Sequence, residues 1–341
     1  MIDFRYHIVS LISVFIALAV GIALGAGPLK EAIGDTLTGQ VQALRSDRDA
    51  LRADLTAAEG AQAEQRSYLE AAGPTLVSGA LTDRRVAVIS LPGADSDDVA
   101  AVEAQLAEAG ATVSGRVSVT DNWTDPSLRS FRQALAGNLV PYVLPAPAED
   151  AGTEVELAEA LAEGLTGADP AAPDSQSESA GLIIELLANA DSALITVADE
   201  ITAPADAIVI VTGAPADEDS TSAPVEDVVA AQVAIADAAQ NRTEGAVVAT
   251  ADVTSGDLVS TIANTEELAS SLSTVSGMDQ VTGQLSVPLA LNARIGGTVG
   301  HFGFGDNESP FPERTTLGPV DRTPAQAEAD PASVDGAGVT G

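Results

Sequence analysis

The sequence predicts an α/β protein in which one N-terminal membrane helix and a coiled-coil stalk precede a large soluble domain. Three observations support this: an uncharged apolar run from Ile8 to Pro28, a heptad repeat from Leu37 to Ala72, and an alternation of short β-branched runs with helical segments after Gly73. The 341 residues leave room for one large or two small domains beyond the membrane segment.

The run from residue 8 to 28 predicts a transmembrane anchor. Its 21 residues carry no charge, and at about 1.5 Å per helical residue they cover roughly the 30 Å of a bilayer's hydrocarbon core. A cleaved signal peptide has a basic start and a shorter apolar run, whereas residues 1–7 hold Arg5 offset by Asp3. We therefore expect an uncleaved anchor, although Ala23 and Gly25 are spaced as in a cleavage site and leave removal open.

The orientation of this anchor is set only weakly by charge, because Arg5 precedes the span and Lys30 follows it. We expect residues 1–7 to be a short cytoplasmic N-terminus and the large domain to be extracytoplasmic. Ala17, Gly21 and Gly25 recur at intervals of four, the spacing with which small residues let two membrane helices approach closely. They indicate a helix–helix contact in the membrane, or they are ordinary small residues of a membrane helix.

Residues 29–72 predict the coiled-coil stalk. Apolar residues follow one another at alternating steps of four and three, and Arg48, Gln62 and Gln65 are polar members of the same row. Three interpretations stay open: a parallel dimer, contact with a partner protein's helix, or a single helix packed along its own domain. The residues that would make the contact form the predicted seam, which comprises Leu37, Val41, Leu44, Leu51, Leu55 and Leu69.

Residues 73–312 predict a Rossmann-like α/β domain. Residues 85–91 read as a buried strand, residues 97–109 as a helix stopped by Gly110, and residues 112–119 as the next strand. Such a β-α-β unit recurs downstream, which implies a sheet with helices on both faces. The further expected strands are 193–197, 207–211 and 246–250, with a helix at 225–240.

The turn after the first strand argues against a nucleotide site. It contains only Gly93 where a dinucleotide fingerprint needs three glycines, and Asp95, Asp97 and Asp98 lie where a pyrophosphate would bind the helix N-terminus. No P-loop, nucleophile elbow or HExxH motif occurs in the sequence. We expect no cofactor and no enzymatic activity.

Donors for a metal site are scarce. The sequence has no cysteine, two histidines (His7 and His301) and two methionines (Met1 and Met278). Because copper(I) favours Cys and Met and copper(II) favours imidazole, we expect no metal site built by this chain alone.

Acidity is the most unusual feature of the composition. There are 50 acidic against 15 basic residues, a net charge of -35. This charge argues against nucleic acid as a partner and against a domain that lies on anionic lipid. It fits adaptation to salt or general solubility, or else a basic partner.

Three further segments carry expectations. Residues 145–181 are rich in Pro, Glu and Ser and suggest a flexible insertion with one helix, and residues 313–341 predict a disordered acidic tail. The glycine–aromatic stretch 296–305 contains Phe302 and Phe304, which form either an exposed contact surface or part of the core.

Taken together, these features resemble the actinobacterial MctB family, also described as SteB-like. The resemblance rests on the opening MIDFRYHIVSLISVFIALAVGIALG, the stalk, the VAVISLPGAD strand and turn, and the late VSGMD and GHFG segments. It covers nearly the whole chain apart from the tail, and the N-terminal block is its most specific part.

The resemblance implies a cell-envelope protein with one of two roles. The first is copper efflux, proposed for the family to involve an outer-membrane channel, and the second is a non-enzymatic scaffold in cell separation with a membrane partner and a cell-wall hydrolase. A channel of that kind requires a closed barrel, whereas the residues predict buried α/β strands and one helical span. The resemblance therefore supports a copper role, while the residues favour action through self-association or a partner protein bound at the stalk.

Overall fold

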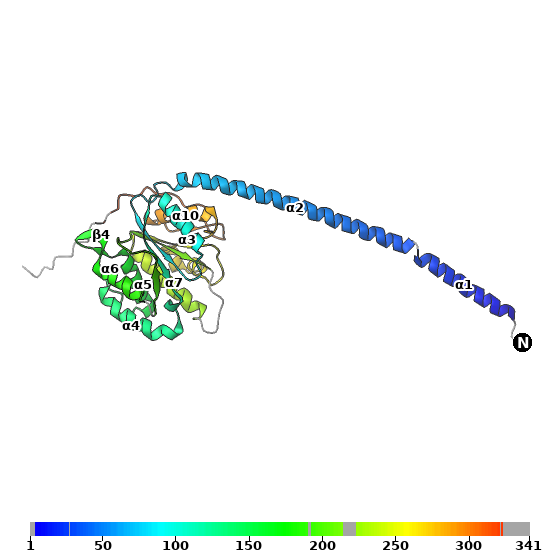
Figure 1. Ribbon diagram of the computed structural model, residues 1–341, viewed down its shortest axis with the longest axis horizontal. Helices are drawn as coiled ribbons and strands as arrows, with labels where there is room; N and C mark the ends of the chain where they lie inside the picture. Colours follow the sequence, from blue (N-terminus) through cyan, green and yellow to red (C-terminus); the bar gives the residue numbers. More distant parts are fainter. Residues whose placement is uncertain (1–3, 27, 190–191, 214–222, 321, 323–341) are drawn as a thin grey trace, which may run out of the picture. The chain divides into compact units, whose positions relative to one another are not determined.

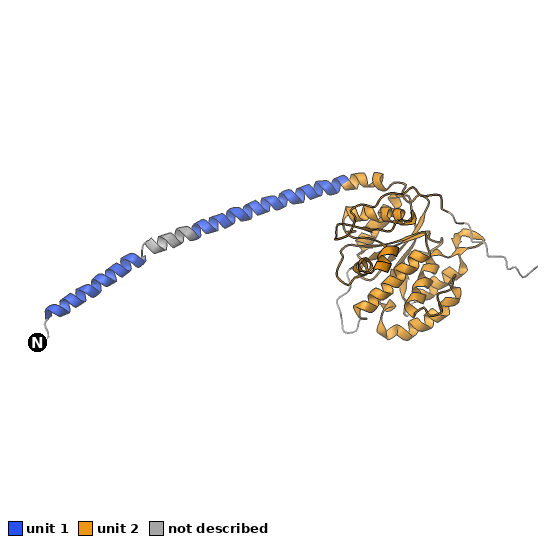
Figure 2. Ribbon diagram, turned by 180° about the vertical axis from the view of Figure 1, so that it is seen from behind, with its two compact units in different colours: residues 1–68 blue, residues 69–341 orange. Residues whose placement is uncertain are grey.

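The computed structural model describes residues 4–26, 28–189, 192–213, 223–320 and 322, and side chains 26–36 lie outside the description. The expected cytoplasmic N-terminus (residues 1–7) and acidic tail (313–341) therefore fall partly outside the described residues. Two compact units are present, residues 1–68 and residues 69–341, coloured separately in Figure 2.

The N-terminal unit consists of helices. α1 spans Phe4–Ala26 and α2 spans Pro28–Val77 (Figure 1). Because the first unit ends at residue 68, the last turns of α2 belong to the second unit. Among the described residues, one helix is long and apolar enough to cross a membrane, over Phe4–Gly25. This single apolar N-terminal helix agrees with the predicted anchor. The predicted coiled coil is helical throughout its described part, and its pairing stays a prediction.

The second unit is built on a seven-stranded mixed sheet with the order β5-β2-β1-β6-β7-β8-β9. All neighbouring strands run parallel except β2 and β5, which are antiparallel. The α/β class is thus confirmed, with one antiparallel edge strand added to a parallel sheet. The strands are β1 (Arg85–Ser90), β2 (Thr112–Val119), β5 (Ile195–Val197), β6 (Ala207–Thr212), β7 (Ala246–Thr250), β8 (Ser273–Val275) and β9 (His301–Phe302).

Strand side chains alternate between two buried faces. In β1, Ala87 and Ile89 belong to one hydrophobic cluster while Val86 and Val88 belong to the other, as the two-residue period of a strand requires. Every residue of β6 and β7 is buried. A parallel sheet covered on both faces needs such continuous apolar strands, which is why these runs were recognisable in the sequence.

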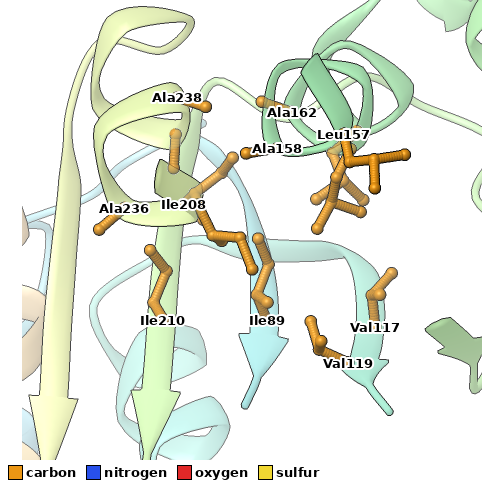
Figure 3. Packing of buried hydrophobic residues seen from close by; sticks show 14 of the residues in the cluster. Ile89, Val117, Val119, Leu157, Ala158, Ala162, Ile208, Ile210, Ala236 and Ala238 are labelled. Atoms are coloured by element: carbon orange, nitrogen blue, oxygen red, sulfur yellow. The ribbon is translucent and has the colours of Figure 1, made fainter. Parts of the chain in front are cut away.

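Helices cover both faces. Ala158 and Ala162 of α5 and Ala236 and Ala238 of α7 pack in the larger cluster, and Figure 3 shows the two helices against the strand side chains. The small alanine side chains let these helices lie close to the sheet. The opposite face is covered mainly by α3 and α10. The helices of this unit are α3 (Ser96–Glu108), α4 (Arg129–Leu139), α5 (Thr153–Thr166), α6 (Glu178–Leu187), α7 (Val225–Asn241), α8 (Leu258–Asn264), α9 (Glu266–Ser271) and α10 (Val281–Ile295).

The helix after β1 ends as the sequence predicts. Asp95 caps its N-terminus by accepting a hydrogen bond from the backbone N–H of Asp97 at 2.8 Å. Gly110 follows its C-terminus with φ of +89°, a left-handed conformation that favours glycine.

In place of the expected flexible insertion, residues 145–181 contribute to the core. α5 buries Leu157, Leu161 and Leu165 fully or nearly so. A short hairpin follows, formed by β3 (Ala168–Asp169) and β4 (Ala172–Gln176). The polar composition of the segment lies in its loops, whereas the leucines and alanines of α5 repeat at helical spacing and cover the sheet.

The described start of the expected tail is held against the domain by polar contacts. Asn292 of α10 donates to Thr315 O at 3.0 Å and accepts from Thr315 N at 2.7 Å. Arg322 binds the Asp206 carboxylate with its Nε and Nη2 atoms at 3.0 and 2.7 Å. Residues 313–320 and 322, here named the C-terminal segment, are therefore part of the folded unit. Hydrophobic patterning did not reveal this because the contacts are hydrogen bonds and ion pairs.

Candidate functional site

The predicted membrane contact lies on α1. Ala17, Gly21 and Gly25 are exposed, and a methyl group built on Gly21 or Gly25 would meet nothing within 4 Å. The helix satisfies the Ser13 hydroxyl internally, since Ser13 Oγ donates to Val9 O at 2.6 Å. The small-residue face is therefore open to another helix, and its pairing remains a prediction.

The predicted seam is exposed along most of its length. Leu37, Val41, Leu44, Leu51 and Leu55 keep 44 to 69% of their surface accessible. Leu69, which belongs to the second unit, is half-buried. Covering such a row of exposed apolar side chains with another apolar surface would lower the free energy.

One polar member of that row has a local partner. Arg48 binds the neighbouring Asp49 at 2.6 Å, and both side chains are more than half exposed. Such an exposed ion pair contributes at most about 1 kcal/mol to stability, so it adds little to the stability of the helix.

The loops at the β1–β6 junction come into backbone contact. This junction is where the strand order reverses, the usual ligand crevice of open α/β sheets. A Cβ on Gly213 would lie 1.7 Å from Gly93 O, and Leu91 N donates to Val211 O at 2.8 Å. Nothing therefore separates Gly93 from Gly213 at this point of the crevice.

Carboxylates occupy the adjoining end of α3. Asp97 and Asp98 lie in its first turn, beside the capping Asp95. Burial, followed by the carboxylates of Asp95 and Asp279, raises the pKa of Asp98. This end of the helix therefore presents negative charge where a phosphate would need hydrogen-bond donors.

His301 is committed to hydrogen bonds within the fold. Its Nδ1 lies 2.8 Å from Thr274 Oγ1 and its Nε2 lies 3.2 Å from the carbonyl oxygen of Ala269. Because a carbonyl can only accept, we assign Nε2 as the donor and Nδ1 as the acceptor of the threonine hydroxyl. Met278 is buried with 1% exposure. Within the described ranges, no group of three or more His, Cys, Asp or Glu side chains is placed to hold a metal ion.

Sequence reasoning missed a cavity of about 600 Å³ formed by α8 and by the loops that follow β7, β8 and β9. The signal that could have found it is the glycine–aromatic stretch, whose two phenylalanines separate in the structure. Phe302 is buried with 6% exposure, whereas Phe304 is 75% exposed and lines the cavity.

A protein-family model described as "Copper transport outer membrane protein, MctB" matches residues 1–312. The chain belongs to the MctB family. The match includes α1, α2 and the second unit as far as residue 312.

Curated relatives agree with this MctB assignment. Proteins named "Copper transporter MctB" from Mycobacterium tuberculosis and Mycobacterium bovis are 32% identical over 321 residues, which cover 89% of this chain and 97% of each relative. The Mycobacterium leprae protein of the same name is 30% identical over 142 residues, 41% of this chain and 45% of its own length.

Proposed function

We propose that this MctB-family chain is a single-pass cell-envelope protein that serves copper homeostasis, with α1 in the membrane and the folded unit outside it. The observation that carries the proposal is the family match over residues 1–312, together with copper-transporter names on relatives aligned over 89% of the chain. The proposed parts are a cytoplasmic N-terminus (1–7), the anchor (8–28), the stalk (29–72) and the α/β domain from residue 73. The role in cell separation finds no support in the names of these relatives.

The chemistry of α1 favours an indirect role in copper movement. Ser10 and Ser13 are the polar side chains of its membrane run, and Ser13 already donates to a backbone carbonyl. A single helix of this kind offers a metal ion no row of ligands to follow. We therefore propose that the chain acts in an assembly rather than as a conduit by itself, and that it has no enzymatic activity.

Self-association through α1 and α2 is the assembly that the exposed surfaces favour. Both the small-residue face (Ala17, Gly21 and Gly25) and the exposed seam leucines lie in the N-terminal unit. A parallel dimer would cover both at once, because equivalent positions meet in a parallel pair. A partner protein that contributes the second helix is the alternative that the test must separate.

Gene deletion tests the copper role. We expect a deletion strain to accumulate copper relative to its parent, and the full chain supplied in trans to restore the parental content. Unchanged copper content after deletion would remove the proposal. A purified full chain that conducts copper ions across a lipid bilayer would contradict the indirect mechanism.

Single cysteines test the assembly and the orientation, since the natural chain has none. Leu51→Cys lies in the predicted seam and should give disulfide-linked dimers of the full chain in membranes. Ala53→Cys lies on the other side of the same helix and is the matched control that should stay monomeric. Equal cross-linking of both variants would contradict the seam.

Labelling of Ala53→Cys in intact cells with a maleimide that cannot cross membranes checks the orientation. We expect labelling without permeabilisation, because the proposal places α2 outside the membrane. Labelling that requires permeabilisation would place the folded unit inside.

A further inference from the structure

The cavity beside β7, β8 and β9 lies at the carboxyl end of the sheet, away from the β1–β6 junction. Asp252 and Val253 follow β7, Ser276 to Gln280 follow β8, and Phe304 to Glu308 follow β9. These loops leave the carboxyl ends of three parallel neighbouring strands, the edge at which open α/β sheets bind their ligands. Its volume of about 600 Å³ falls within the range of about 300–1,000 Å³ typical of ligand sites.

The acidic side chains that line this cavity have no basic counterpart among the Lys and Arg residues. The lining includes the carboxylates of Asp252, Asp279, Asp306 and Glu308, and no lysine or arginine belongs to it. His301, the remaining titratable lining residue, already uses both ring nitrogens in hydrogen bonds. Asp279 also contributes to the raised pKa of Asp98, so the negative potential continues toward the start of α3.

Apolar surface accompanies these carboxylates. Phe304 is 75% exposed and Val253 is 44% exposed, and both line the cavity. An aromatic face beside carboxylates attracts cations through the ring quadrupole as well as through charge. Apolar side chains next to acidic ones also match a ligand with an aliphatic stem and a charged end.

The loop that presents Phe304 is fixed by its own hydrogen bonds. Glu308 Oε2 accepts from Gly305 N and from Ser276 Oγ, each at 2.7 Å. Gly303 has φ of +153°, and a Cβ there would lie 2.0 Å from Ser276 Oγ, so only glycine fits. The loop that carries the exposed ring is therefore fixed by its own backbone and side-chain contacts.

The lining also bears on which kind of cation the cavity would take. Within the described residues, no three of them converge as a metal ion would require. A guanidinium has five N–H donors in a rigid plane and can reach carboxylates that stand apart, while its stem packs on apolar side chains. Arginine thus fits the lining better than a single metal ion does.

We propose that this cavity is a docking site for an arginine side chain presented by an exposed segment of a partner protein. Charge complementarity and the exposed aromatic ring commit the site to this occupant. The proposal does not depend on the copper role, because it rests only on the lining of the cavity.

Binding of a labelled peptide with the sequence Gly-Arg-Arg-Gly to the full chain in detergent tests this proposal. Fluorescence anisotropy should show saturable binding that weakens with added salt. We expect a Gly-Lys-Lys-Gly peptide to bind several-fold more weakly and a Gly-Glu-Glu-Gly peptide not to bind. Absence of arginine-peptide binding at millimolar concentration, or displacement of the peptide by stoichiometric Ca²⁺, would overturn the proposal.

Matched variants separate this site from the general acidity of the chain. Phe304→Ala and Asp279→Asn should each weaken binding at least about fivefold. Phe311→Ala removes a phenylalanine that is 54% exposed but does not line the cavity, and Asp174→Asn neutralises an acid that is 84% exposed elsewhere. Both controls should bind like the natural chain. Equal losses in the site variants and the controls would show non-specific attraction and refute the site.

Discussion

Removal of the Asp206 carboxylate should destabilise the folded unit strongly, because this one side chain joins β1, β6 and the C-terminal segment. Asp206 is 8% exposed and accepts from Arg85 N at 2.7 Å and from Arg322 Nε and Nη2 at 3.0 and 2.7 Å. In Asp206→Ala, the backbone N–H of Arg85 and two mostly buried guanidinium groups lose their common acceptor.

The magnitude follows from these contacts. Breaking a buried charge pair costs about 3–5 kcal/mol, and Arg322, whose side chain is 27% exposed, recovers part of this through water. We therefore expect Asp206→Ala to lower the free energy of unfolding by about 3 kcal/mol, roughly a hundredfold in the folding equilibrium constant. Asp174→Ala is the matched control: Asp174 lies 3.5 and 3.9 Å from the same two arginines but is 84% exposed, so its loss should cost less than about 1 kcal/mol.

Denaturant unfolding of the full chain in detergent measures both variants. The single tryptophan, Trp123, is 1% exposed within the folded unit, so its fluorescence reports the unfolding of that unit. Equal stability of Asp206→Ala and Asp174→Ala would refute the view that the Asp206 carboxylate holds these elements together.

Three more predictions concern the folded unit. Burial raises the pKa of Glu163, while hydrogen bonds from Arg322 and the Arg85 backbone outweigh burial and lower the pKa of Asp206. Glu163, whose pKa is raised, destabilises the fold less as the pH falls from 7 toward about 4, whereas Asp206, whose pKa is lowered, loses its stabilising contribution below about pH 4. The thermal unfolding temperature should therefore be highest near about pH 4 and fall on the acid side. A steady decline in that temperature from pH 7 downward would contradict this prediction. Gly213→Ala should lower the free energy of unfolding by at least about 2 kcal/mol, because its methyl group would meet the backbone of the loop after β1. In the control Gly181→Ala the nearest atom to the new methyl group is 3.8 Å away, so this variant should keep its stability. Equal effects of the two variants in urea titrations would argue against the loop contact. Leu161→Ala should cost about 3 kcal/mol because this side chain of α5 is fully buried, and a loss below about 1 kcal/mol would restore the idea of a loosely attached segment.

The sequence predicted those helices and strands that are marked by a local residue pattern. The strands at 112–119 and 246–250 match the expected limits. Residues 246–250 are buried throughout, as a strand covered on both faces requires, whereas residues 112–119 are only partly buried and alternate valine with polar residues toward their end. The end of the helix after β1 was recognisable from Gly110, which follows its last residues. The uncharged run near the N-terminus likewise identified the apolar helix by length alone.

Contacts between distant residues could not be read in the same way. The order of the strands and the role of α5 depend on which surfaces meet in three dimensions. The C-terminal segment is the clearest case, because Asn292 and Asp206 hold it through polar contacts that leave no periodic pattern. The cavity beside β9 also depends on three loops far apart in the sequence. The seam and the small-residue membrane face remain predictions.

Cell copper content measured with a seam variant tests the central claim most directly. In a deletion strain, the full chain and the control Ala50→Ser/Ala53→Ser/Ala57→Ser should restore the parental copper content. The variant Leu44→Ser/Leu51→Ser/Leu55→Ser, present in membranes at the same level by immunoblot, should leave copper high. Full restoration by the seam variant would contradict the claim that this MctB-family protein serves copper homeostasis through an assembly formed by its stalk.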